Sequence, residues 1–261
     1  METLFPLMGI VFLSNLTEAC AGFGSTILAI IFGARYFSIE DLIPILVPLN
    51  LLLSLTIVLR YPRDVDRKAL VSRILPLTGI GMPIGIAIFQ YAPSRALKIA
   101  FGVIVVLLGL FELATEALAK TKASRAGTPA GKTAAQNRGL PAWQGVLFLL
   151  GGGVMQGLYA SGGPFVVYYA SREIRDKRKF RTTLALLWLI LNIVLVASLI
   201  LTGKLTRFTL LYSLYLLPAL LLGMGAGMKV HDRVSETVFR RLVYALLVVA
   251  GASLAYRTAT S

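Results

Sequence analysis

The chain has 261 residues, of which 57% are hydrophobic and only 15% charged, and its mean hydropathy is +0.78. Soluble domains average roughly 45–50% apolar and about 25% charged residues, so this composition excludes a water-soluble globular protein and indicates a lipid bilayer as the solvent. The net charge of +14 would suggest nucleic acid in a soluble protein, but here the basic residues form short clusters between long apolar runs, so we expect no nucleic-acid partner. One cysteine and one histidine predict no internal disulfide, no metal site and no cofactor.

The first half of the chain contains apolar stretches of two lengths. Leu4–Cys20 and Ser25–Phe37 are short, and Ala21-Gly22-Phe23-Gly24 separates them. The stretches that follow have the roughly 20 mostly apolar residues of a membrane-spanning helix: Ile39–Arg60, Ala69–Tyr91 and Arg95–Ala119. The polar segment Lys120–Gly139, which has no acidic residue, then predicts a flexible linker.

The second half has the same order of short and long stretches. Its short pair is Trp143–Leu158 and Phe165–Ala170, separated by the Gly-rich segment Tyr159–Pro164, and the long stretches are Phe180–Leu201, Phe208–Met228 and Phe239–Tyr256. Each short pair predicts two helices that meet at a break inside the membrane, either re-entrant or fully spanning. We therefore expect a first transmembrane repeat (1–119), a basic linker (120–139) and a second repeat (140–261).

Residue identities recur between the halves in two registers. An offset of 138 places Glu18 on Gln156 and Gly24 on Gly162. An offset of 142 relates further pairs, namely Asn50 with Asn192, Pro76 with Pro218, Gly81 with Gly223, Gly85 with Gly227 and Lys98 with Arg240. The change in register fits a longer loop at Ser171–Arg181. These matches predict an internal duplication.

The distribution of basic residues predicts the orientation. If each opening pair enters and leaves on one side, the positive-inside rule places 20 of the 26 Lys and Arg in the cytoplasm, within Arg60–Arg73, the linker, Arg172–Arg181 and Lys229–Arg241. Both termini then lie outside the cell. We expect an all-α polytopic protein of the inner (plasma) membrane with two inverted-topology repeats, each having a broken or re-entrant opening helix pair followed by three transmembrane helices.

Inverted repeats with broken helices are a transporter architecture, because the unpaired N–H groups of a helix that begins inside the membrane favour an anion. The helices expected to begin at Ser25 and Phe165 have this property. The predicted substrate-binding residues are Gly22, Gly24, Ser25, Thr26, Asn50, Gln156, Tyr159, Ser161, Gly162, Gly163 and Asn192. The alternative is that the glycines serve close helix packing and that the asparagines bond neighbouring helices.

Three charged residues are candidates for coupling or charge pairing. Glu18 is an acidic residue within an apolar stretch, and three interpretations of it stay open: a proton-coupling group, a partner for a basic side chain, or a neutral buried acid. Lys98 and Arg240 either attract anions or snorkel to the membrane interface.

The sequence predicts that the protein is not an enzyme. Ser161 has no membrane histidine to act as its base, and the sequence has no P-loop motif for ATP-driven transport. A lipid-phosphate enzyme would need clustered carboxylates, whereas Glu18 stands alone.

Both breaks carry motifs that resemble a known family. The residues are Glu18-Ala-Cys-Ala-Gly-Phe-Gly-Ser-Thr26, Gly157-Leu-Tyr-Ala-Ser-Gly-Gly-Pro-Phe165 and the Pro/Gly pattern from Pro76 to Gly85. With the basic central linker, they make the chain similar to the sulfite exporter TauE/SafE family of membrane transporters. The resemblance implies transport of small sulfur-containing anions such as sulfite, sulfoacetate, other organosulfonates or thiosulfate.

We expect an exporter that works by alternating access around the two helix N-termini. The alternatives are an ion-coupled importer of sulfur oxyanions and a membrane-embedded lipid-phosphate enzyme. The expected partners are the small anionic substrate and the bilayer. The sequence leaves open whether the chain forms a homodimer.

Overall fold

The computed structural model describes residues 3–21, 24–125, 141–174, 176–231 and 236–260, and the regular elements in these ranges are all helices. The first half contains α1 (Leu4–Ala21), α2 (Ser25–Gly33), α3 (Ile39–Arg60), α4 (Arg67–Ala69), the π-helical turn η1 (Leu70–Ile74), α5 (Leu75–Tyr91) and α6 (Ser94–Arg125). The second half contains α7 (Ala142–Tyr159), α8 (Gly163–Glu173), α9 (Lys177–Leu201), α10 (Arg207–His231) and α11 (Glu236–Thr260).

The predicted all-α membrane fold is confirmed. Among the described residues, five helical segments are long and apolar enough to cross a membrane: Ile39–Arg60, Arg67–Tyr91, Ser94–Thr115, Arg178–Leu201 and Arg207–Gly227. Helix α3 has the predicted bounds. Helix α6 is longer than expected and continues to Arg125, so the start of the predicted linker is helical. The linker from residue 126 onward lies outside the described residues.

Polar caps explain where two of the central helices begin. The Ser38 hydroxyl accepts the Asp41 N–H at 3.1 Å before α3, and Glu40 and Asp41 place negative charge at the positive end of that helix. Before α9, the Asp176 carboxylate accepts the Lys179 N–H at 2.9 Å. This hydrogen bond from the backbone lowers the pKa of Asp176.

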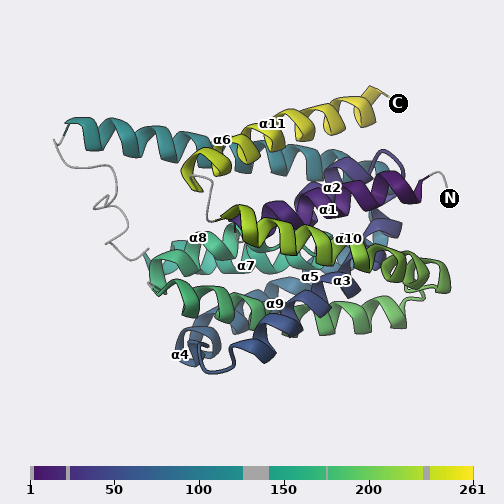
Figure 1. Cartoon of the computed structure of the whole chain (residues 1–261), viewed down its shortest axis with the longest axis horizontal. Coiled ribbons are helices and arrows are strands. Elements are labelled where there is room, and N and C mark those ends of the chain that lie inside the picture. Colours follow the sequence, from purple (N-terminus) through teal and green to yellow (C-terminus); the bar gives the residue numbers. More distant parts are fainter. Residues whose placement is uncertain (1–2, 22–23, 126–140, 175, 232–235, 261) are drawn as a thin grey trace.

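Figure 1 shows how the helices run along the bundle. Helix α1 begins and α11 ends at one end of the bundle, whereas α6 ends and α7 begins at the opposite end. The short helix α4 lies at that opposite end as well (Figure 1). Within the described ranges, the most extensive helix contacts are those of α1 with α10, α5 with α7, α3 with α9 and α6 with α11.

Glycines allow the α5–α7 and α1–α10 pairs to approach closely. A Cβ atom at Gly81 or Gly85 of α5 would overlap the carbonyl oxygens of Leu150 or Val154 in α7. A Cβ atom at Gly223 of α10 would overlap the Phe12 carbonyl of α1 in the same way. Gly81 and Gly223 are 142 residues apart, and Phe12 and Leu150 are 138 apart, so the two contacts follow the registers seen in the sequence. Small residues at such crossings are typical of membrane helix pairs.

Candidate functional site: two polar helix junctions

The first junction joins α1 to α2. Gly24 precedes α2 in the left-handed region, with φ 103°, and has no side chain to cap the helix. The Glu18 Oε2 atom does so instead, because it accepts the Ser25 N–H at 3.1 Å. The carboxyl group of Glu18 therefore lies at the positive end of α2, where the helix dipole favours its ionised form.

The second junction joins α7 to α8 and uses the same device with a neutral group. Ala160 ends α7 in the left-handed region, with φ 51°. The Gln156 Oε1 atom accepts the Gly162 N–H at 2.9 Å. Helix α8 begins at Gly163 and not at Phe165 as predicted, since Pro164 fits the first turn, where its missing N–H needs no partner. Gln156 thus stabilises α8 without placing a charge there.

An asparagine from the central α3–α9 pair connects to each junction. Asn50 Nδ2 of α3 donates to Thr26 Oγ1 at 2.9 Å, and Asn192 Oδ1 of α9 accepts from Gln156 Nε2 at 2.9 Å. Gln156 and Asn192 are both buried, at 2% and 3% exposure. Both asparagines bond neighbouring helices in this structure, and their predicted contact with substrate remains a prediction.

The junction glycines differ in the space around them. A Cβ atom added at Gly24 or Gly163 would meet no atom of the described chain within 4 Å. At Gly162 it would overlap the Gly152 carbonyl, so this glycine serves helix packing. Open space beside Gly163 lets a small ligand approach the start of α8. Gly22 lies outside the described residues.

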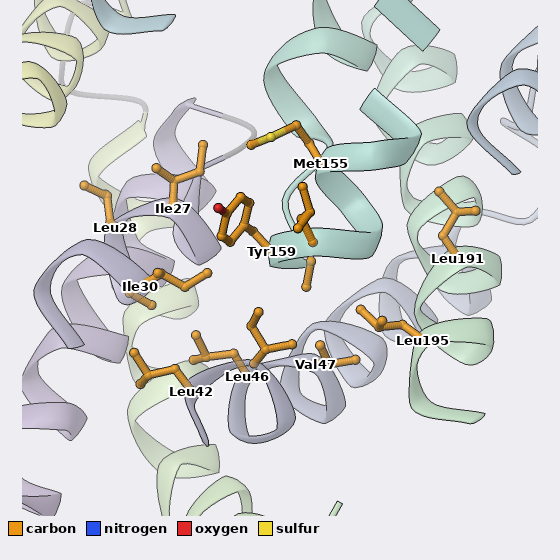
Figure 2. Close-up of a cluster of buried hydrophobic side chains, with 14 of the residues drawn as sticks. Ile27, Leu28, Ile30, Leu42, Leu46, Val47, Met155, Tyr159, Leu191 and Leu195 are labelled. Carbon is orange, nitrogen blue, oxygen red and sulfur yellow. The ribbon is translucent and has the colours of Figure 1, made fainter. Parts of the chain in front are cut away.

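Tyr159 occupies an apolar position instead of an open one. Figure 2 shows its ring among buried side chains of α2 and α3, including Ile27 and Leu46. Its hydroxyl donates to the Leu97 carbonyl at 2.9 Å, and its ring packs on Phe101 at a centroid distance of 4.6 Å. These contacts fix α7 against α6. Ser161 is also buried, at 7% exposure, and follows Ala160 directly at the second junction.

The remaining charged candidates have different surroundings. Lys98 Nζ donates to the Ala34 carbonyl at 3.2 Å, where α2 ends, and its positive charge is favourable at that position. The side chain of Arg240 lies outside the described part of the chain.

Arg181 interacts electrostatically with Glu18 and is not among the site residues predicted from the sequence. It lies near the start of α9 and is far from Glu18 in sequence, so only the packing of α9 reveals the pair. The described residues contain no cluster of three or more His, Cys, Asp or Glu that could hold a metal ion. The Glu18 carboxyl group caps the first junction, whereas Gln156, which carries no charge, caps the second.

A known protein family matches almost the whole chain. The model for sulfite exporter TauE/SafE matches residues 7–254. The chain belongs to the TauE/SafE family. Membership confirms the resemblance seen in the junction motifs and implies transport of sulfite or related sulfur anions across a membrane. No curated protein and no solved structure matches this TauE/SafE chain.

Proposed function

We propose that this TauE/SafE protein exports small sulfur-containing anions such as sulfite, sulfoacetate or other organosulfonates, and that it is a transporter and not an enzyme. The observation that carries the proposal is the second junction, where α8 begins beside open space at Gly163 and its cap, Gln156, is uncharged. The backbone N–H of Gly163 and the Ser161 hydroxyl supply donors for the oxygen atoms of the anion. The positive end of the α8 dipole adds a favourable field.

Alternating access, in which the binding site opens first to one side of the membrane and then to the other, requires two halves that can move against each other. We propose that residues 1–119 and 140–261 are inverted repeats. The equivalent contacts of Gly81 with Leu150 and of Gly223 with Phe12 support this arrangement. In such repeats, alternating access is largely a rocking of one bundle against the other around a fixed site.

The direction of transport follows from the membrane potential. The proposal places the chain in the inner membrane, with the linker in the cytoplasm and both termini outside. A membrane potential of 100 mV changes the free energy of an elementary charge by about 2.3 kcal/mol. The free energy of a dianion that leaves a negative cytoplasm therefore falls by about 4.6 kcal/mol. Export therefore needs no coupling ion.

The position of the acidic Glu18 at the first junction favours a second candidate function, that of an ion-coupled importer. Import works against the potential and needs a cation that travels with the anion. Glu18 holds the Ser25 N–H and interacts with Arg181, so its protonation would change both the charge and the hydrogen bonding at the first junction. In an exporter without coupling, the same carboxylate only stabilises α2.

Reconstitution into proteoliposomes distinguishes these functions. Uptake of labelled sulfite, sulfoacetate and thiosulfate is measured with an imposed potential of either sign. The proposal predicts saturable uptake that a potential positive inside accelerates, and it predicts that Glu18→Gln retains this uptake. Uptake that requires a proton gradient and is lost in Glu18→Gln would establish the importer. Uptake no faster than in protein-free liposomes for all three anions would contradict the proposed function.

A further inference from the structure

A cavity of about 300 Å³ lies away from both junctions, where α5 and α7 begin and α8 ends. Its polar lining consists of Arg73, Tyr169, Arg172 and Glu173, and Leu77 and Leu149 contribute to its apolar wall. The volume is at the lower end of the range for ligand pockets, which extends from about 300 to 1,000 Å³. The lining of the cavity thus combines charged side chains with apolar ones.

The charged side chains of the cavity favour an anion. Arg73 and Arg172 outweigh the single carboxylate of Glu173, which interacts electrostatically with Arg73. The guanidinium of Arg172 stacks over the Tyr168 ring at 3.6 Å, and its Nη1 donates to the Tyr168 carbonyl at 2.7 Å. These contacts fix the guanidinium plane and leave other N–H donors for a ligand, which suits a bidentate bond to phosphate.

Neighbouring side chains place the cavity at the depth of lipid headgroups. Trp143, in the first turn of α7, is 63% exposed and directly follows Ala142 of the cavity lining. Exposed tryptophans in membrane proteins concentrate at the interface between headgroups and hydrocarbon. Val146, one turn further along α7, also lines the cavity and is 38% exposed. An amphiphile could hold its charged group at the arginines and lay its chain along this apolar surface.

The two arginines have no charged counterparts at the equivalent positions of the proposed repeats. The registers of 142 and 138 relate Arg73 to Tyr215 and Arg172 to Ala34, neither of which is charged. The corresponding positions for Gly145 and Tyr169 of the cavity are Leu7 and Ile31. The two charges and the tyrosine of the cavity, which residues of both halves line, therefore have no counterpart at the equivalent positions.

From these features we propose that the cavity binds the headgroup of an anionic phospholipid, whose phosphate is held by Arg73 and Arg172. Basic pockets between membrane helices are known to hold such headgroups. The proposal is separate from the transport site, since it uses none of the residues of the two junctions.

Native mass spectrometry of the purified full-length protein tests this site. The protein is titrated with dioleoyl phosphatidylglycerol, with dioleoyl phosphatidylcholine and with inorganic phosphate. The variants are Arg73→Gln, Arg172→Gln and the matched control Arg63→Gln, which removes an exposed arginine outside the cavity. Because Arg172 contacts Tyr168, and Arg73 interacts with Tyr169 and Glu173, the thermal unfolding of each variant is measured as a check on folding.

The expected result is one tightly bound phosphatidylglycerol that phosphatidylcholine does not replace. Each cavity variant should weaken its binding about fivefold, the effect of one basic residue near a membrane surface, and Arg63→Gln should leave it unchanged. Equal binding of the two lipids, or wild-type affinity in Arg73→Gln, would overturn the proposal. Displacement of the lipid by millimolar inorganic phosphate would show that the cavity takes a free anion instead.

Discussion

Replacing Gln156 with glutamate tests the claim that the second junction holds the transported anion. The new carboxylate can still accept the Gly162 N–H, and Asn192 can rotate its amide to donate in place of accepting. An anion on the Gly163 N–H would lie about 5 Å from this carboxylate, where two unit charges repel by about 3 kcal/mol at an effective dielectric constant near 20. The affinity for a monoanion should therefore fall roughly 150-fold.

The assay is the concentration dependence of labelled sulfite uptake into proteoliposomes, with thermal unfolding in detergent as the check on folding. Gln144→Glu is the control, because it adds the same charge to α7 about 18 Å away along the helix axis. The control should transport sulfite with nearly wild-type affinity. An unchanged affinity in Gln156→Glu, with a wild-type melting temperature, would show that the anion does not bind at this junction.

Further variants test the packing, the buried hydrogen bonds and the charges. Gly85→Leu should lower the melting temperature sharply, because the added Cβ atom would overlap a carbonyl oxygen of α7. The control Gly79→Leu should leave the melting temperature nearly unchanged, because a Cβ atom there meets no described atom within 4 Å. Equal melting temperatures of the two variants would contradict the close packing of α5 on α7. Asn192→Leu leaves the Gln156 Nε2 atom without its acceptor and should cost about 1–3 kcal/mol in the free energy of unfolding. Arg181→Gln removes a positive charge that attracts anions, so it should slow sulfite transport at low ionic strength. The difference from the wild type should shrink as salt screens this attraction. A defect independent of salt would argue against an electrostatic role of Arg181.

Apolar patterning was sufficient to predict most of the helices. Helix α3 could be placed residue by residue because its apolar run is framed by Ser38 and Arg60. The end of α6 could not, since Lys120–Arg125 are polar and their helix continues beyond the apolar part of the sequence. The short helix α2 ends at Gly33, before the predicted Phe37, and the π-helical turn before Pro76 has no recognisable sequence pattern.

The candidate site was only partly accessible from the sequence. The register that pairs Glu18 with Gln156 pointed to two side chains that prove to have equivalent places, each accepting an N–H at the start of the following helix. Spacing along the chain does not reveal that Arg181 interacts with Glu18, because that pair depends on the packing of α9. It also does not distinguish a tyrosine that faces a ligand from Tyr159, which packs among apolar side chains and bonds Leu97.

The most direct test of the account is an experimental structure determined with selenite, a heavier analogue of sulfite that can be located by its anomalous scattering. The account predicts an anomalous peak at the start of α8, within hydrogen-bond distance of the Gly163 N–H and the Ser161 hydroxyl. A peak elsewhere, with the start of α8 closed by side chains in a protein that transports sulfite, would contradict it.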